Sequence, residues 1–391
     1  MDSINLCCNS LLPCKKDLEF KLSGSKSISH RILIINYLAK SDCKVQNLSD
    51  SEDTTVLLNA LSSKNNTIQL SRSGTAMRFL ISLFAYEGRD IVLEGEKSLL
   101  NRPISNLIAN LNSLGANILK VDNQICIKKS NLIGRPLSFQ FNFTSQYISS
   151  LLLVAPYVKN GIDIILDTNT YSKSYINMTT SMMQTCGAKL KIYNNQIKVF
   201  QSTYTKSIDF IESDWTSASY LFLAFLFSKF QKIKIKFLHQ ASIQGDSVII
   251  DFFSLFGVLS TFHNDTLLLE KKPGHPKPHR IEWNFSNSPD LFPTILVACF
   301  GLGVELLAHG VSTLIYKESN RIVSMKNELL KFNNSFLEIK TQDCVSLKPS
   351  NKIIDSKSIS IDTYNDHRVA LSLSTLSLLG FNLEIISLST L

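Results

Sequence analysis

Apolar residues recur along the chain in a unit made of an amphipathic helix, a tight stop and a β-hairpin. The first clear copy is RPISNLIANLNSLGANILKVDNQICIK, residues 102–128. Gly115 supplies a left-handed stop, and two short strands flank the turn letters DNQ. The residues before that stop have helical spacing and predict a helix: Ile104, Leu107, Ile108, Leu111 and Leu114.

The same unit returns three times downstream. Its stops are Gly187, Gly257 and the pair Asn333–Asn334, so that successive stops lie 72, 70 and about 76 residues apart. The segment TVLLNALSSKNNTIQLS (55–71) is an earlier, eroded copy. Four near-regular copies with both helices and strands predict an α/β (α+β) protein built by duplication.

Composition adds size and class to this picture. The chain has 391 residues, of which 44% are apolar, enough for a large core and more than one domain. No apolar run approaches the roughly 18–20 residues of a spanning helix, and the first residues lack the pattern of a signal peptide. The eight cysteines have no zinc-ligand or disulfide-framework spacing. We expect a cytoplasmic protein without a metal site and without membrane attachment.

The formal charge of +8 favours anionic partners. No block of five or more basic residues occurs, and KKPGHPKPHR (271–280) is interrupted by proline and glycine. A small acidic substrate explains the charge as well as RNA does, and we expect no nucleic acid.

The stretch KLSGSKSISHR (21–31) resembles a phosphate-binding loop at first sight. A nucleotide P-loop needs Gly-Lys-Ser/Thr after an earlier glycine, and here Ser25 separates Gly24 from Lys26 while Glu19 stands at the place of the first glycine. What remains is a helix start with Lys26 and Arg31, which can attract an anion. For this stretch by itself, an ordinary helix start with a solvated lysine is the favoured interpretation.

Further polar clusters lie at the edges of the repeated units. NSPDLFPT (287–294) places Asp290 at a predicted helix N-cap, and TYNDHRVALSLS (363–374) places polar residues ahead of an apolar helix. In IYKESNRI (315–322), a predicted helix puts Lys317 and Arg321 on one face with Glu318 beside them. Each cluster alone is also explained by a surface ion pair or a capped helix.

Taken in order, these motifs resemble those of the EPSP synthase family, the 3-phosphoshikimate 1-carboxyvinyltransferases. The resemblance runs from about residue 19 to 380 and is carried by GSKSISHR, SGTAMRF, IESDWTSASY, SIQGD, PDLFPT, KESNR and TYNDHR. It implies two similar domains, each of three βαβαββ units around a pseudo-threefold axis. We expect a central domain of 24–213 and a discontinuous one of 1–23 plus 214–391, with hinges near 23–24 and 213–214.

The resemblance also implies an activity. The enzyme transfers the enolpyruvyl group of phosphoenolpyruvate to the 5-hydroxyl of shikimate 3-phosphate by addition and elimination, with no metal ion or other cofactor. We expect a monomer whose partners are these two substrates, and whose domains close on the first of them.

Roles carry over from the family by motif position. The catalytic residues are expected to be Asp290 as base, Glu318 as acid/base, and Lys26. Shikimate 3-phosphate is expected to contact Lys26, Ser27, Arg31, Thr144, Ser145, Gln146, Ser172, Tyr175, Asp290, Thr313 and Lys317. Phosphoenolpyruvate is expected to contact Lys26, Gly74, Arg102, Gln146, Arg321 and Arg368.

Some positions depart from the family pattern. Arg72 and Phe79 stand where many members have Asn and Pro, and the sequence stops after LLGFNLEIISLSTL, where the family continues through a lysine-containing loop.

Three alternative functions remain open. The first is the sister enzyme that acts on UDP-N-acetylglucosamine, whose reactive cysteine has no counterpart in EGEKSLLNRP. The second is a non-catalytic phosphate-binding remnant. The third is RNA-end chemistry on a related repeat fold, but this sequence lacks the histidine motif that such enzymes are expected to have.

Overall fold

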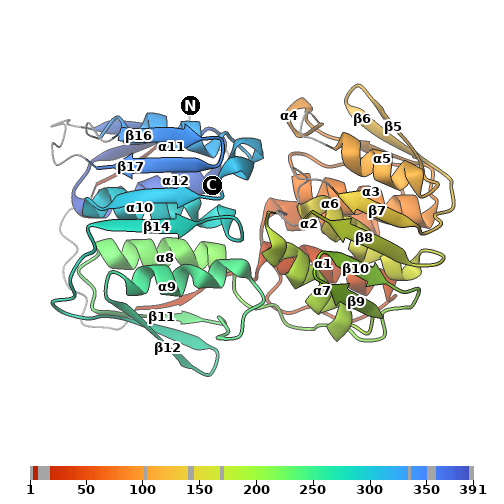
Figure 1. Cartoon of the computed structure of the whole chain (residues 1–391), viewed down its shortest axis with the longest axis horizontal. Helices are drawn as coiled ribbons and strands as arrows, with labels where there is room; N and C mark the ends of the chain where they lie inside the picture. Colours follow the sequence, from red (N-terminus) through yellow and green to blue (C-terminus); the bar gives the residue numbers. More distant parts are fainter. Residues whose placement is uncertain are drawn as a thin grey trace. The chain divides into compact units, whose positions relative to one another are not determined.

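The computed structural model describes residues 3–7, 18–100, 104–139, 145–167, 171–332, 336–349 and 358–386 (Figure 1). The chain divides into two compact units, of which unit 1 is Met1–Leu22 with Ser213–Leu391 and unit 2 is Ser23–Glu212. The divisions fall between residues 22 and 23 and between 212 and 213, beside the expected hinges.

Unit 2 contains two four-stranded sheets with the same topology. The first has the order β3-β4-β6-β5 and the second β7-β8-β10-β9. In each, the first two strands are parallel and a helix connects them, whereas the last two form an antiparallel hairpin. The strands are β3 (Thr67–Gln69), β4 (Ile91–Glu94), β5 (Asn117–Val121), β6 (Gln124–Lys128), β7 (Pro136–Phe139), β8 (Ile162–Leu166), β9 (Leu190–Tyr193) and β10 (Gln196–Val199).

The helices of unit 2 divide into inner and outer ones. The inner helices α1, α3 and α6 contact one another and are buried on most sides, which suits their largely apolar sequences. The helices of unit 2 are α1 (Lys26–Leu38), α2 (Glu52–Ser62), α3 (Gly74–Glu87), α4 (Lys97–Leu100), α5 (Ser105–Ser113), α6 (Ser145–Val154) and α7 (Lys173–Thr185).

Unit 1 repeats this plan. Its four-stranded sheets have the orders β2-β11-β13-β12 and β14-β15-β17-β16, and a three-stranded sheet has the order β18-β19-β1. The strands are β1 (Ser3–Leu6), β2 (Leu18–Lys21), β11 (Lys232–Lys236), β12 (Val258–His263), β13 (Thr266–Lys271), β14 (Arg280–Asn284), β15 (Glu305–His309), β16 (Phe336–Thr341), β17 (Cys344–Lys348), β18 (Ile359–Asp362) and β19 (Leu383–Ile386).

The order of strands in unit 1 shows how the chain is threaded. β2 pairs in parallel with β11 although about two hundred residues separate them, because the whole of unit 2 is inserted between them. β1 pairs antiparallel with β19, so residues near both ends of the chain share one sheet. The helices are α8 (Trp215–Phe227), α9 (Ile249–Ser254), α10 (Phe292–Leu302), α11 (Arg321–Leu329) and α12 (His367–Ser374).

Each unit has its own hydrophobic core. In unit 1 the inner helices α8, α10 and α12 contact one another, and α10 is buried from Phe292 to Phe300. Such continuous burial explains why the helix FPTILVACFGL has no polar face. Each fully buried phenylalanine contributes roughly 1.5–3 kcal/mol through its removal from water.

The predicted repeat is confirmed at the three glycine stops. α5, α7 and α9 are each followed by a glycine with positive φ, namely Gly115 (105°), Gly187 (98°) and Gly257 (75°), and then by a hairpin. The stop at Asn333–Asn334 lies outside the described residues.

The interpretation of 55–71 as an eroded copy needs correction. α2 is followed by the single strand β3, which pairs in parallel with β4 and opens the next sheet, so no hairpin follows this helix. Among the described residues no helix is long and apolar enough to cross a membrane.

Candidate active site

Asp290 is the centre of a cluster of charged side chains in unit 1. It lies in the 3-10 turn Pro289–Leu291, directly before α10. Its Oδ1 is 3.1 Å from Lys317 Nζ and 2.7 Å from Arg321 Nη1, and its Oδ2 is 3.0 Å from Arg368 Nη2. The predicted N-cap role is wrong, because Leu291 is the cap residue of α10 and the carboxylate binds three cations instead.

Arg321 is fully buried and binds three carboxylates. Besides Asp290, its Nη2 lies 2.6 Å from Glu318 Oε2 and its Nε lies 2.9 Å from Asp366 Oδ2. The predicted helix through 317–321 is wrong: Lys317 follows the 3-10 helix Ser312–Tyr316, and α11 begins only at Arg321. The expected juxtaposition is nevertheless present, because this non-helical link still brings Lys317 and Arg321 onto one carboxylate.

Asp366 contacts two arginines, one through its backbone and the other through its guanidinium. Its Oδ1 accepts a hydrogen bond from the backbone N–H of Arg368 and caps α12, while its Oδ2 binds Arg321. The side chain is 0% exposed, so these contacts satisfy a carboxylate that has no access to water. The capped helix predicted at TYNDHR is confirmed, with Asp366 as the capping residue.

The charges in this cluster shift one another's proton affinities. Burial alone would raise the pKa of Asp290, but Arg368, Lys317 and Arg321 outweigh it and hold that pKa well below its usual range. Burial would likewise lower the pKa of Arg321, but the surrounding carboxylates raise it above its usual value. Asp290 is therefore ionised, and Arg321 stays charged throughout the accessible pH range.

Thr313, another predicted substrate contact, lies in the 3-10 helix Ser312–Tyr316. Its Oγ1 is buried and has no hydrogen-bond partner among the described residues. Leaving a buried hydroxyl unsatisfied costs about 1–3 kcal/mol, so Thr313 Oγ1 is suited to bind a polar group of a substrate.

In unit 2, Lys26 opens α1 and pairs with Asp53. Lys26 Nζ is 2.9 Å from Asp53 Oδ2, and about a quarter of each side chain is exposed. Burial acts to raise the pKa of Asp53, yet Lys26 and other groups lower it to about 2. Gly24 lies just before α1 because a Cβ there would come 1.8 Å from the carbonyl oxygen of Asn47.

Arg31 is buried without a carboxylate partner among the described residues. Its guanidinium donates to Thr179 Oγ1 (2.7 Å), Ser149 Oγ (3.1 Å), and the carbonyl oxygens of Ser27 (2.7 Å) and Tyr175 (3.3 Å). Burial lowers its pKa to about 10. The structure thus brings Ser27, Arg31 and Tyr175 together, but it engages most of the guanidinium donors of Arg31 within the protein.

Gln146 and Gly74 meet at the starts of two inner helices. Gly74 is the first residue of α3, and Arg78 Nη1 donates to the Gly74 carbonyl oxygen (2.9 Å) and to Gln146 Oε1 (2.8 Å). Gln146 Nε2 also donates to Thr75 Oγ1 at 3.1 Å. Ser145 is the first residue of α6 and is 7% exposed. Helix N-termini and an arginine therefore gather here, which favours an anion.

The remaining predicted residues differ in how far the structure places them. Ser172 is the N-cap residue of α7, with a left-handed φ of 57° and no side-chain cap bond. Thr144 and Arg102 lie outside the described residues.

Sequence reasoning missed two participants and underrated one. Asp53 was not singled out, although Ser51 followed by two acidic residues is typical of a capped helix start. Asp246 was only one letter of the SIQGD motif, yet it is buried beside this cluster. Asp366 was interpreted as part of a helix cap, and its contact with Arg321 has no sequence signal.

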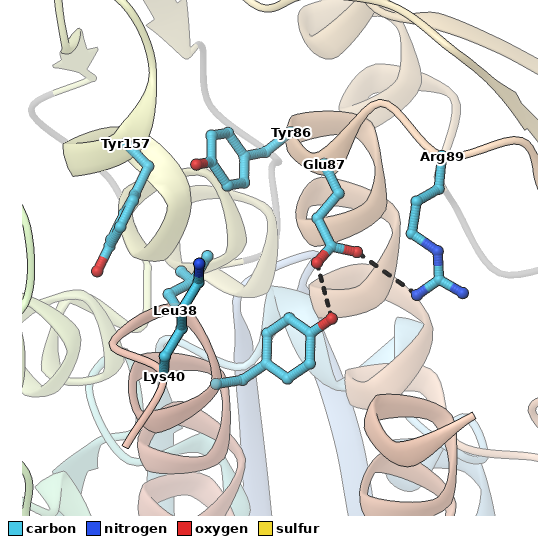
Figure 2. Close-up of a pocket in the computed structure, with 7 residues that line it drawn as sticks. Leu38, Lys40, Tyr86, Glu87, Arg89 and Tyr157 are labelled. Atoms are coloured by element: carbon cyan, nitrogen blue, oxygen red, sulfur yellow. Dashed lines mark hydrogen bonds and ion pairs between the residues drawn. The ribbon is translucent and has the colours of Figure 1, made fainter. Parts of the chain in front are cut away.

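A separate hollow in unit 2 has a volume of about 700 Å³ and contains none of the predicted site residues. Figure 2 shows Tyr86 and Tyr157 near one another, and a dashed line joins Glu87 to Arg89, whose Nη1 lies 3.6 Å from Glu87 Oε2. Tyr37 donates to Glu87 Oε1 at 2.7 Å, and burial together with this bond raises the pKa of Tyr37 to about 12. Within the described ranges, no group of three or more His, Cys, Asp or Glu side chains is placed to hold a metal ion.

Comparisons with known proteins relate the chain to one family. A family model described as EPSP synthase (3-phosphoshikimate 1-carboxyvinyltransferase) matches residues 16–63 and 59–387. A protein named 3-phosphoshikimate 1-carboxyvinyltransferase from Bacteroides fragilis (strain YCH46) is 33% identical over 365 residues, covering 92% of this chain and 88% of that protein. One with the same name from Haemophilus ducreyi is 30% identical over 396 residues, covering 92% and 89%.

A solved structure titled EPSP synthase from Acinetobacter baumannii has a similar fold. Its TM-score is 0.74 at 19% sequence identity, and the match covers 98% of this chain and 94% of that chain. The predicted fold class is confirmed by this likeness.

Proposed function

This chain belongs to the EPSP synthase family, the 3-phosphoshikimate 1-carboxyvinyltransferases, and from that premise we propose how its residues carry out the reaction. It transfers the enolpyruvyl group of phosphoenolpyruvate to the 5-hydroxyl of shikimate 3-phosphate, giving 5-enolpyruvylshikimate 3-phosphate and phosphate. The resemblance on which the family was predicted is therefore confirmed.

The contact that best supports the assignment of roles is the one between Arg321, Arg368 and Asp290. Two arginines and Lys317 lie on a single buried carboxylate, 2.7–3.1 Å from its oxygens. Phosphoenolpyruvate carries a carboxylate and a phosphate, and such groups form strong charge-assisted hydrogen bonds with guanidinium. We propose that the substrate takes over part of the cationic charge that Asp290 holds in its absence.

This exchange explains how Asp290 acts as a base. With three cations around it, its pKa is too low for it to take a proton from a hydroxyl efficiently. When Arg321 and Arg368 turn to the substrate, Asp290 loses part of that stabilisation and its pKa rises toward its usual value. Substrate binding thus turns a carboxylate that stabilises charge into one that accepts a proton.

Glu318 is proposed as the acid and base at the methylene carbon. Once the substrate has drawn Arg321 away from Glu318, this carboxylate takes a proton from water. In the addition step it gives that proton to the methylene carbon, while Asp290 takes the hydroxyl proton and the hydroxyl oxygen bonds to the adjacent carbon. In the elimination step the methyl proton returns to Glu318, the carbon–oxygen bond to phosphate breaks, and phosphate leaves with the hydroxyl proton. At 31% exposure Glu318 can exchange protons more readily than the fully buried Asp366.

Residues of unit 2 are proposed to bind the substrate phosphates. Lys26 is partly exposed at the first turn of α1, and Ser145, Gln146 and Gly74 lie at or near the helix starts of α6 and α3. Ser27, Ser172 and Tyr175, with Thr144 and Arg102, complete the proposed set. Arg31 is proposed to act mainly by fixing Tyr175 and Ser27, since four of its hydrogen bonds are already made within unit 2.

The test is release of phosphate from the purified protein. We expect release only when shikimate 3-phosphate and phosphoenolpyruvate are both present, and none when UDP-N-acetylglucosamine replaces the first. Asp290→Asn and Glu318→Gln should each lower kcat by about 10²–10⁴-fold. Asp122→Asn, in the exposed turn between β5 and β6, is the matched control. No release by the wild type would favour the non-catalytic phosphate-binding remnant.

We also propose that the enzyme acts as a cytoplasmic monomer without metal ion or other cofactor. Activity that survives exhaustive dialysis against a chelator, together with a sedimentation mass near 43.9 kDa, would agree with this proposal. Loss of activity that added metal restores, or a mass twice as large, would contradict it.

A further inference from the structure

Asp246 is a buried carboxyl group that the proposed reaction does not use. It lies in the 3-10 turn Gly245–Val248 and is 4% exposed. Its Oδ2 accepts a hydrogen bond of 2.6 Å from Thr216 Oγ1 on α8. Its Oδ1 is buried and has no hydrogen-bond partner, and the carboxyl group has no ion pair, within the part of the chain that the structure describes.

The turn that carries Asp246 is fixed against α8. Gln244, the residue before this turn, accepts a hydrogen bond from the backbone N–H of Trp215 (3.1 Å) and donates one to the carbonyl oxygen of Ser213 (2.9 Å). These bonds, with that of Thr216, leave the carboxyl group little freedom to move toward a cation or toward water. Its environment is therefore set by the fold.

Three charged groups act on Asp246 from the elements around it. Asp290, before α10, and Asp214, the N-cap of α8, disfavour a second negative charge, and Arg368 on α12 favours one. Burial is the largest influence, and together these effects raise the pKa of Asp246 to about 7. A buried carboxyl group with one hydrogen bond and no ion pair is expected to be neutral at moderately acidic pH.

The charge count of the cluster explains why this neutrality matters. Asp290, Glu318 and Asp366 balance Lys317, Arg321 and Arg368 when Asp246 is neutral. Ionised Asp246 adds a negative charge to a cluster that must accept an anion, and it attracts Arg368 away from that anion.

We propose that Asp246 is a positioning residue that must carry a proton for phosphoenolpyruvate to bind at Arg321 and Arg368. The inference rests on the proposed function. Arg368 is thereby left to the substrate, while Thr216 holds the neutral acid in place.

Substrate binding has a defined effect on this proton. An anion beside Arg368 disfavours ionised Asp246, so its pKa rises when phosphoenolpyruvate binds. Above about pH 7 the free enzyme has lost the proton and takes one up on binding. Affinity is therefore full below the pKa of the free enzyme and falls as the pH rises above it.

The first test compares the KM for phosphoenolpyruvate of wild type and Asp246→Asn from pH 6 to pH 8. Asparagine imitates the neutral acid, and the ratio of the two KM values cancels the ionisation of the substrate itself. We expect a ratio near one at pH 6 and a wild-type KM about tenfold higher at pH 8. Asp251→Asn, an exposed carboxylate on the neighbouring helix α9, should behave as wild type.

A second variant keeps the proposal testable if Asp246→Asn folds poorly. Thr216→Val removes the hydrogen bond that favours the ionised form, so the pH at which KM rises should move upward. Thr216→Ser keeps the hydroxyl and should restore the wild-type profile. The inference requires the pKa of Asp246 to rise when this bond is lost, whereas a merely structural role of Asp246 would leave the pH profile of KM unchanged. An unchanged profile in Thr216→Val would therefore overturn the inference.

Calorimetry gives a readout besides activity. Titration of phosphoenolpyruvate in the presence of shikimate 3-phosphate, in buffers of different ionisation enthalpy, measures the protons taken up on binding. At pH 8 we expect greater uptake by wild type than by Asp246→Asn. Equal uptake with normal turnover would contradict the inference alone, whereas the absence of binding and turnover in wild type would contradict the proposed function.

Discussion

Two buried arginines, one in each unit, have opposite pKa shifts because their surroundings differ. Arg31 in unit 2 is surrounded by neutral acceptors, and burial lowers its pKa to about 10. Arg321 in unit 1 is buried at least as deeply, but three carboxylates raise its pKa above the usual value. The same residue type at the same depth therefore has opposite shifts, because its partners either carry charge or do not.

This difference has a functional consequence. The charge of Arg31 is not neutralised by any described carboxylate, so it contributes a positive potential at the site where a substrate phosphate is proposed to bind. In unit 1 the cations are paired with carboxylates, and we propose that a substrate competes with these carboxylates for them. In this proposal, unit 2 attracts an anion, and unit 1 couples anion binding to the proton affinity of Asp290.

The largest expected effect comes from replacing each arginine by methionine. Arg321→Met leaves Asp366 and Asp290 buried with less compensation, and should lower the free energy of unfolding by about 3–5 kcal/mol. Arg31→Met loses hydrogen bonds to neutral groups and removes a desolvated charge, so a smaller loss of about 1–3 kcal/mol is expected. Urea denaturation of both variants measures the difference. Equal losses would contradict the comparison.

Acid stability tests the partly exposed pair in unit 2. The pKa of Asp53 is about 2 in the folded protein and lies below its unfolded value, so the pair stabilises the fold at higher pH. That contribution, about 2 kcal/mol, is lost as the pH falls from about 4 to about 2. Denaturation midpoints of wild type and Asp53→Asn between pH 2 and pH 6 measure it. The variant should lack this part of the pH dependence, and parallel curves would refute the assignment.

The smallest effect is expected at an exposed ion pair. Arg72 lies 2.8 Å from Glu96, and the two side chains are 51% and 47% exposed. Arg72→Ala should lower the free energy of unfolding by less than about 1 kcal/mol, because water already solvates both charges. Thermal denaturation at low and high salt measures this loss. A loss as large as that of Arg321→Met would show that pairing, rather than burial, decides the energetics.

Several features were predictable because they depend on residues close together in sequence. The glycine stops at Gly115, Gly187 and Gly257 need a positive φ that glycine adopts without strain, and the structure has it at all three. The cap of α12 and the contact between Glu318 and Arg321 are likewise local.

Other features were not predictable because they join residues that are distant in sequence. Nothing local in PDLFPT shows that Asp290 binds Arg368, 78 residues away, in preference to capping a helix. The helix predicted through 317–321 is wrong because Asn320 caps α11, which begins only at Arg321. The positions of Lys317 and Arg321 depend instead on their ion pairs with the distant carboxylates of Asp290 and Asp366. The buried state of Asp246 depends on α8 and was likewise invisible.

The sequence by itself determined the repeated helix–stop–hairpin unit, the family and the set of charged residues. Backbone preferences depend on residues that are adjacent in the chain, and the order of the motifs can be compared without a structure. Only the tertiary structure decided which carboxylate meets which cation. Electrostatic energy depends on distance in space and on burial, and both arise when helices from separate repeats pack together. The pKa values of Asp290, Arg31 and Asp246 therefore depend on the tertiary structure, although the sequence shows that each residue is present.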